Sequence, residues 1–106
     1  MATIRAYVYK DEGLFDSYKV YPPVVVLGNG DKFELVNTVD GHDAVWTVPG
    51  DPFQGGTITD KHIAPHKKSG EKTPKVSQDA IAFEYKVKVD GHDAHAHSDP
   101  VIIIDP

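Results

Sequence analysis

Histidine is the residue type of this chain best suited to chemistry, and three of its six copies lie within six residues. The histidines are His42, His62, His66, His92, His95 and His97. Neutral imidazole is the commonest transition-metal ligand in proteins. Because the chain has no cysteine, it has no thiolate ligand, disulfide or cysteine nucleophile, and nitrogen ligands alone favour copper(II), zinc or nickel. The cluster predicts a transition-metal site, and the alternative is a loop with solvent-exposed histidines.

One hexapeptide occurs twice, as Val-Asp-Gly-His-Asp-Ala at 39–44 and again at 89–94. In both copies the histidine follows a predicted strand and a bend. We therefore expect two loops at one end of the molecule, each offering an imidazole (His42 and His92) to one site. The aspartates Asp43 and Asp93 would then fix the tautomers of the rings as hydrogen-bond acceptors. A preference of Asp-Gly for turns explains that dipeptide, but not a histidine at the same place twice.

The elements that must position these histidines are short strands, because alternation with a period of two dominates the chain. Gly- and Pro-containing turns separate them. Segments 64–75 and 90–100 are predicted as exposed loops. This pattern predicts an all-β sandwich or barrel. The predicted strands are 4–9, 18–21, 24–27, 32–37, 44–48, 57–63, 81–89 and 101–104. The predicted buried core is Phe33, Leu35, Val45, Ile81, Phe83, Tyr85, Val87, Ile102 and Ile104, with Trp46 on the opposite face to Val45.

The order of strands and histidines resembles that of the cupredoxins, the family of plastocyanin and azurin. These proteins have a strand ending in Asn, a short loop, and a ligand His followed by a polar residue and an apolar strand. Here Asn37 is followed by His42 and by Asp43-Ala44-Val45-Trp46. The resemblance extends from Val24 to Asp105, and it implies a cupredoxin-like fold, which is an antiparallel Greek-key β-sandwich with mixed pairing. The alternative is an immunoglobulin-like sandwich, which shares the architecture.

The closing segment of the cupredoxins also has a counterpart in this chain. It contains two aromatic residues, a ligand Cys, a ligand His, an axial Met and a last apolar strand. Phe83 and Tyr85 match the aromatic residues, Val89 stands where the cysteine would be, His92 matches the second histidine, and His97 falls near the axial methionine. Blue copper sites require the copper–thiolate bond, so the resemblance with Val89 implies a site that is not blue.

Two interpretations follow from the resemblance and from Val89 in place of the ligand cysteine. In the first, the domain binds copper or zinc through His42, His92 and either His95 or His97. In the second, it is a metal-free cupredoxin-like scaffold or protein-interaction module that has lost the copper site. An enzyme is the least favoured class, since the sequence places no general base.

Length, charge and hydropathy limit what can be expected of the number of domains, the partners and the compartment. The 106 residues suit one domain over 1–106. The formal charge of −5 disfavours nucleic acid as a partner. No apolar run approaches the roughly 18 residues of a membrane span. No signal-peptide pattern precedes the first strand, although the resembling family is mostly periplasmic or extracellular, so the compartment stays open.

Overall fold

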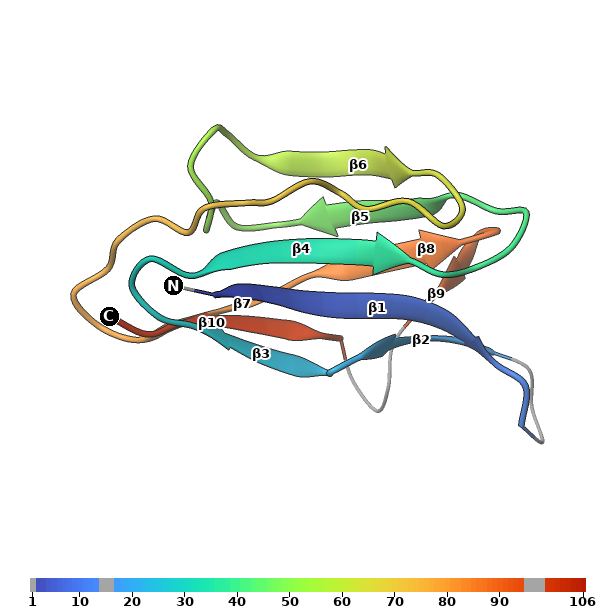
Figure 1. Cartoon of the computed structure of the whole chain (residues 1–106), viewed down its shortest axis with the longest axis horizontal. Coiled ribbons are helices and arrows are strands. Elements are labelled where there is room, and N and C mark those ends of the chain that lie inside the picture. Colours follow the sequence, from blue (N-terminus) through green and yellow to red (C-terminus); the bar gives the residue numbers. More distant parts are fainter. Residues whose placement is uncertain (1, 14–16, 95–98) are drawn as a thin grey trace.

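Strands make up the regular structure of this protein. The computed structural model describes residues 2–13, 17–94 and 99–106, and within these it contains strands and no helix (Figure 1). The all-β class predicted from the sequence is confirmed. The strands are β1 (Thr3–Asp11), β2 (Ser17–Tyr21), β3 (Val24–Leu27), β4 (Lys32–Asn37), β5 (Ala44–Val48), β6 (Ile58–Ile63), β7 (Ile81–Glu84), β8 (Lys86–Val89), β9 (His92–Asp93) and β10 (Val101–Ile104).

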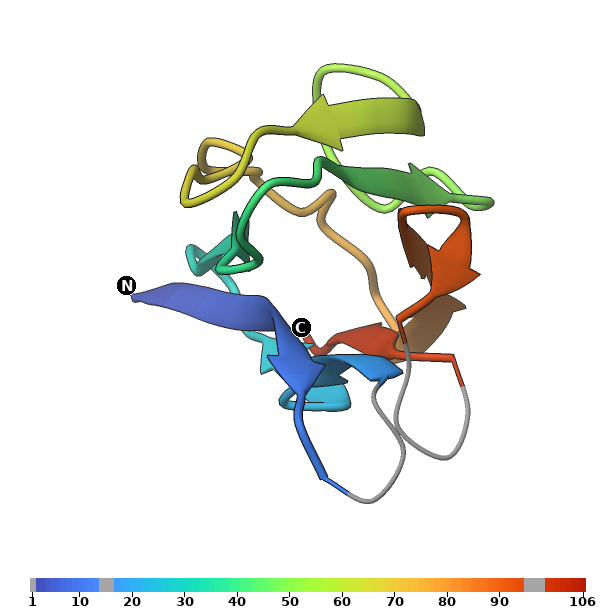
Figure 2. The same cartoon turned by 90° about the vertical axis from the view of Figure 1, so that its right-hand side faces the viewer.

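The described strands form three small sheets around one interior. Their orders are β2-β1-β4, β3-β10-β7 and β6-β5-β8-β9. The pairs β1/β4 and β3/β10 are parallel, and the other pairs are antiparallel. Figure 2, which looks along the long axis of the molecule, shows β5 and β6 on one side of the interior and β1, β3 and β10 on the other. This mixed pairing agrees with the predicted sandwich.

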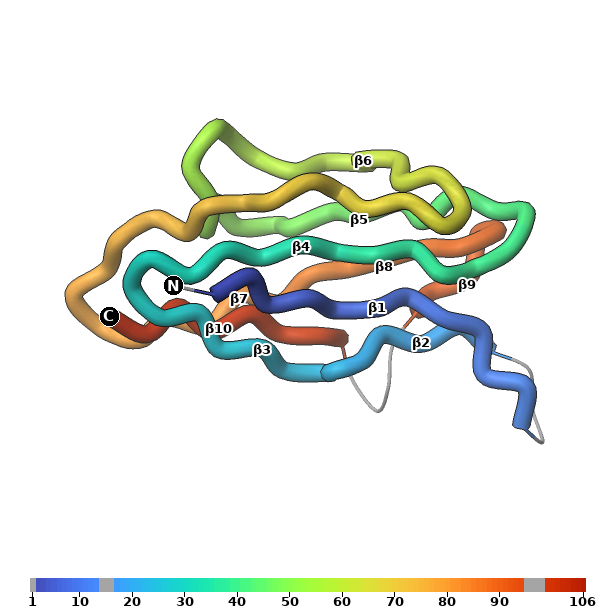
Figure 3. Tube along the Cα trace, viewed as in Figure 1, coloured from blue at the N-terminus to red at the C-terminus, as the bar shows by residue number. Residues whose placement is uncertain are grey.

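The strand predicted over 81–89 is in fact two strands that belong to different sheets. β7 pairs with β10, whereas β8 pairs with β5. Tyr85 lies between the two strands, where the chain passes from one sheet to the other. Its backbone N–H donates to the carbonyl of Pro100 at 2.9 Å. Figure 3 follows the chain from β7 into β8. One extended segment therefore joins two sheets, and the alternation of inward side chains continues through it.

An aromatic cluster occupies the centre of the core. Phe33, Trp46, Phe53 and Tyr85 are each at most 1% exposed. The ring centroids of Phe33 and Trp46 are 5.7 Å apart, and those of Trp46 and Tyr85 are 6.1 Å apart. Of the predicted core, these residues are buried: Phe33, Leu35, Tyr85, Val87, Ile102 and Ile104.

Three predicted core residues are not buried. Val45 is only half-buried, because Trp46 takes the inward position in β5 and Val45 faces outward between Lys88 and His62 of the neighbouring strands. Phe83 packs against the edge of the core beside Gly50. Ile81 is 44% exposed, because β7 is an edge strand of its sheet. The alternation over 81–89 was predicted with the right face inward, although burial falls off toward the start of β7, whereas the prediction for 44–48 put the wrong face inward.

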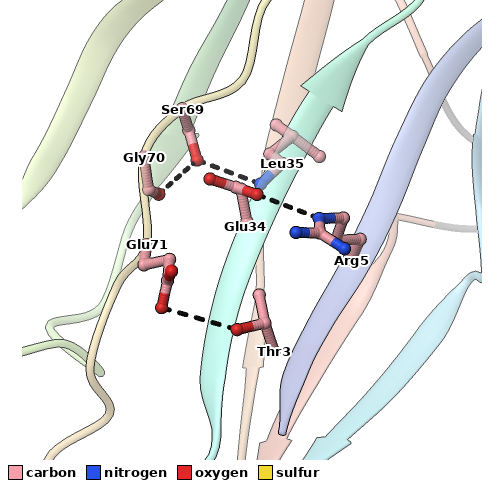
Figure 4. A network of polar contacts seen from close by, with 7 residues as sticks. All are labelled: Thr3, Arg5, Glu34, Leu35, Ser69, Gly70 and Glu71. Atoms are coloured by element: carbon pink, nitrogen blue, oxygen red, sulfur yellow. Dashed lines mark hydrogen bonds and ion pairs between the residues drawn. The ribbon is translucent and has the colours of Figure 1, made fainter.

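The segment predicted as an exposed loop at 64–75 is instead a strap along the free edge of β4. Ser69 and Pro74 are buried. The backbone N–H of Leu35 donates to Ser69 Oγ at 3.0 Å, and Ser69 N donates to the Leu35 carbonyl at 2.8 Å (Figure 4). The hydroxyl of Ser69 donates in turn to the Gly70 carbonyl. These bonds satisfy backbone groups that an open strand edge would leave to solvent.

Candidate metal site at the histidine pole

The histidine-bearing loops gather at one end of the molecule, on the right in Figure 1. Strands β4, β6 and β8 all point toward this end, and β5 starts there. We call it the histidine pole and define it by the loops 38–43, 64–67 and 90–91. Because β4 and β8 end together, the two copies of the repeated hexapeptide leave the sandwich side by side.

Asn37 at the end of β4 shapes the first of these loops. Its side chain is fully buried. The amide Nδ2 donates to the carbonyl of His42 at 3.0 Å and to the carbonyl of Ile63 at 2.9 Å, while Oδ1 accepts from the N–H of Val39 at 2.9 Å. One side chain thus ties the loop of the first repeat to the end of β6.

The two repeats share a burial pattern but not a backbone conformation. In each, the first Val and the last Ala are buried and the four residues between them are exposed. In the first copy Gly41 has a φ of 72° within a bend. In the second copy Asp90 and Gly91 have φ values of 51° and 77° and form a two-residue turn, which pairs His92 with Val89 in the β8–β9 hairpin. Two positive φ values are typical of a type I′ hairpin turn. Segment 90–100, predicted as a loop throughout, therefore begins with a hairpin.

The repeats contact each other through His42 and Asp90. His42 Nδ1 lies 4.0 Å from Asp90 Oδ1, and the His42 side chain is 44% exposed. His92 is exposed on β9. His95 and His97, the other predicted ligands, lie outside the described residues. Within the described part of the chain, no group of three or more His, Cys, Asp or Glu side chains is placed to hold a metal ion. The four-histidine ligand set stays a prediction.

Two further histidines, interpreted from the sequence as ordinary surface residues, lie at the same pole. His62 Nδ1 is 3.1 Å from Asp43 Oδ2, and His66 Nε2 contacts Asp40 Oδ1. Asp43 was expected to serve the histidine of its own repeat, but in the structure it contacts His62. Such a pair is a hydrogen bond when the imidazole is neutral and an ion pair when it is protonated. No sequence pattern indicated the contact of His62 with Asp43. The contact depends on the pairing of β6 with β5, which places His62 opposite Val45.

Comparison with known proteins bears on the fold. No family model matches the chain, and no curated protein sequence matches it. Among solved structures, the chain is similar to Fet3p, a multicopper oxidase that functions in iron import, with a TM-score of 0.57 and 18% identity. The match covers 100% of this chain and 23% of that one. No helix in the described residues is long and apolar enough to cross a bilayer. Strand content, sheet order and this structural match together give the chain a cupredoxin-like fold.

Proposed function

We propose that this chain is a cupredoxin-like domain that binds copper(II) or zinc at the histidine pole. The proposed ligands are His42 and His92, with His95 or His97 as the third. The structural match to a multicopper oxidase supports copper. Imidazoles with neighbouring carboxylates form a donor set that suits copper(II) and zinc.

The observation that carries the proposal is the contact between the two repeats. The 4.0 Å approach of His42 Nδ1 to Asp90 Oδ1 brings the loop of the first copy to the turn of the second. His92 follows two residues after Asp90 on the same hairpin. Both imidazoles are exposed, so neither must leave the core to reach an ion.

The proposed site differs from a blue copper site at Val89, which takes the place of the family's cysteine in this proposal. Val89 is fully buried at the end of β8, where it pairs with Ala44 and His92. Its side chain contributes packing and no donor atom. Bound copper would supply a one-electron redox centre, and bound zinc a Lewis acid. The role of this chain's own residues is to bind and orient: Asn37 holds the His42 loop, and Asp90 faces the His42 ring.

A second candidate is a metal-free scaffold or interaction module on the same fold. It is favoured by the contacts of His62 and His66 with aspartates, because histidines at this pole then have partners within the protein. In this alternative the repeated hexapeptide serves only as a loop with buried Val and Ala ends.

Metal titration without a histidine tag distinguishes the two candidates. The full chain is analysed for bound metal as purified and then titrated with copper(II) and zinc by calorimetry. The metal-site proposal expects one strong site, with copper(II) bound more tightly than zinc, and a large loss of affinity in His42→Ala and in His92→Ala. His62→Ala is the matched control, because His62 is exposed at the same pole but is engaged by Asp43. Unchanged affinity in His92→Ala would leave the scaffold as the function.

A further inference from the structure

The loop that joins β5 to β6 lies at the end of the molecule away from the histidine pole (Figure 1). A small cavity lies beside this loop. Its volume is about 210 Å³. The lining includes two half-buried lysines, Lys61 of β6 and Lys72 of the strap, together with Gly55, Gly56 and Thr57 of the loop. These residues take no part in the proposed metal site.

Backbone hydrogen bonds hold the walls of this cavity in place. Lys72 exchanges two of them with Phe33 in β4, at 2.7 and 2.9 Å. Gln54 N donates to the Thr73 carbonyl at 2.8 Å, which fastens the β5–β6 loop to the strap. Lys61 is paired with Trp46 in the β5–β6 register. Both lysines therefore line one cavity from backbones that hydrogen bonds hold in place, Lys61 from β6 and Lys72 from the strap.

The ammonium groups of Lys61 and Lys72 lie against each other without an acidic partner. The nearby ammonium of Lys72 is the largest cause of a lowered pKa of Lys61, followed by partial burial. Among the described residues, no carboxylate forms an ion pair with either lysine. The next lysine of the strap, Lys75, by contrast has Asp51 at 2.6 Å. Two like charges in contact destabilise the protein unless a counter-charge neutralises them.

The glycines of the loop leave open space and an unused donor beside the lysines. Gly55 and Gly56 have φ values of 94° and 112°, and a Cβ at either position would meet no atom within 4 Å. Gly56 closes a turn over residues 54 and 55, whereas the amide of Gly55 donates no hydrogen bond within the described part of the chain. Backbone N–H groups of a turn next to cationic side chains are a common arrangement around bound oxyanions.

We propose that this cavity binds a dianionic phosphate group through the ammonium groups of Lys61 and Lys72 and the amide of Gly55. Two ammonium groups match two negative charges, and hydrogen bonds between charged partners are stronger than neutral ones. The phosphate is either the free ion or the headgroup of a small phosphomonoester. This activity goes beyond the metal site and does not depend on it.

Titration of the full, untagged chain with inorganic phosphate tests the proposal, with sodium chloride at matched ionic strength as the reference. We expect a saturable rise of the melting temperature with phosphate, because a ligand that binds only the folded state stabilises it. The amide resonances of Gly55 and Gly56 should shift along the same binding curve. Methyl phosphate is titrated in parallel: tighter binding than inorganic phosphate assigns the cavity to a phosphomonoester, and equal or weaker binding assigns it to the free ion.

Substitutions distinguish phosphate binding in the cavity from phosphate attraction to the general surface charge. Lys61→Gln and Lys72→Gln should each weaken phosphate binding by about tenfold, the effect of losing one charged hydrogen bond. Without phosphate, each should melt no lower than the parent, because the contact between like charges is gone. Lys88→Gln, on an exposed position of β8, is the control and should bind as the parent does.

Four results would overturn the proposal. The first is a phosphate response no greater than that of chloride. The second is an equal loss of affinity in Lys88→Gln and Lys61→Gln. The third is a set of shifted amides that does not include Gly55 and Gly56. The fourth is a melting temperature well below that of the parent in both lysine variants without phosphate, because the lysine pair would then stabilise the fold and the cavity would not be an anion site.

Discussion

Replacing Asn37 by Ala should weaken both the fold and the order of the histidine pole. Asn37 is fully buried and makes three hydrogen bonds, to the carbonyls of His42 and Ile63 and from the N–H of Val39. Each buried hydrogen bond contributes about 1 kcal/mol net, with a range of roughly 0.5 to 1.5. The expected loss is therefore about 3 kcal/mol in the free energy of unfolding, or a fall of about 12 °C or more in the melting temperature for a domain of this size.

Urea unfolding followed by circular dichroism measures this loss, and amide hydrogen exchange of Val39 locates it. Thr38→Val is the matched control at the next position. It removes one hydrogen bond, from Thr38 Oγ1 to the Val8 carbonyl at 2.7 Å, on an exposed residue. The control should lose less than about 1 kcal/mol. If Asn37→Ala loses no more than this control does, water replaces the amide and the loop does not depend on Asn37.

Three further predictions concern the core, the metal and pH. Phe33→Ala should cost about 3–5 kcal/mol in urea unfolding, and Phe83→Ala clearly less, because Phe33 is fully buried and Phe83 only packs against the core; equal losses would contradict the assigned core. Added copper(II) should produce no intense absorption band in the orange-red region, since the chain has no cysteine; such a band would contradict the assignment of a site that is not blue. Hydrogen bonds from the backbones of Gly28 and Ala2 lower the pKa of Asp31 below its ordinary value of 3.8. Because the folded state favours the carboxylate, its contribution is present above that value and is lost as the pH falls through the lowered pKa, so acid unfolding of Asp31→Asn should show a weaker pH dependence.

Strands bounded by turn residues were predictable from the sequence. Segments 24–27, 32–37, 44–48 and 101–104 have the predicted limits, because apolar alternation between Gly and Pro signals specifies strands locally. The break at Tyr85 was not predictable in the same way. The alternation of side chains is the same on both sides of it, and only the pairing with two different distant strands separates β7 from β8.

Two further features depended on contacts between residues far apart in the sequence: which face of β5 points into the core, and the covering of the β4 edge by the strap. Val45 was predicted to face the core and Trp46 to face away from it, and this was wrong. Both residues are apolar, so alternation does not decide which of them points inward, and a one-residue shift exchanges them. The strap is rich in lysine and has no strand period, yet its backbone covers the edge of β4. For the candidate site, the repeated hexapeptide led to His42 and His92, but the contact of His42 with Asp90 was not predicted. The contact of His62 with Asp43 depends on the register of β5 with β6, which no local pattern encodes.

Trp46 gives this molecule an optical reporter of its own. It is the single tryptophan of the sequence, it is fully buried, and its ring N–H has no hydrogen-bond partner in the described protein. An indole in such a dry, apolar setting emits at short wavelength, and unfolding shifts the emission to the red. Trp46 lies two residues from Ala44, where β5 leaves the histidine pole, and its ring centroid is 6.1 Å from that of Tyr85. Intrinsic fluorescence therefore follows the unfolding of the core from one known site, and does so without a label.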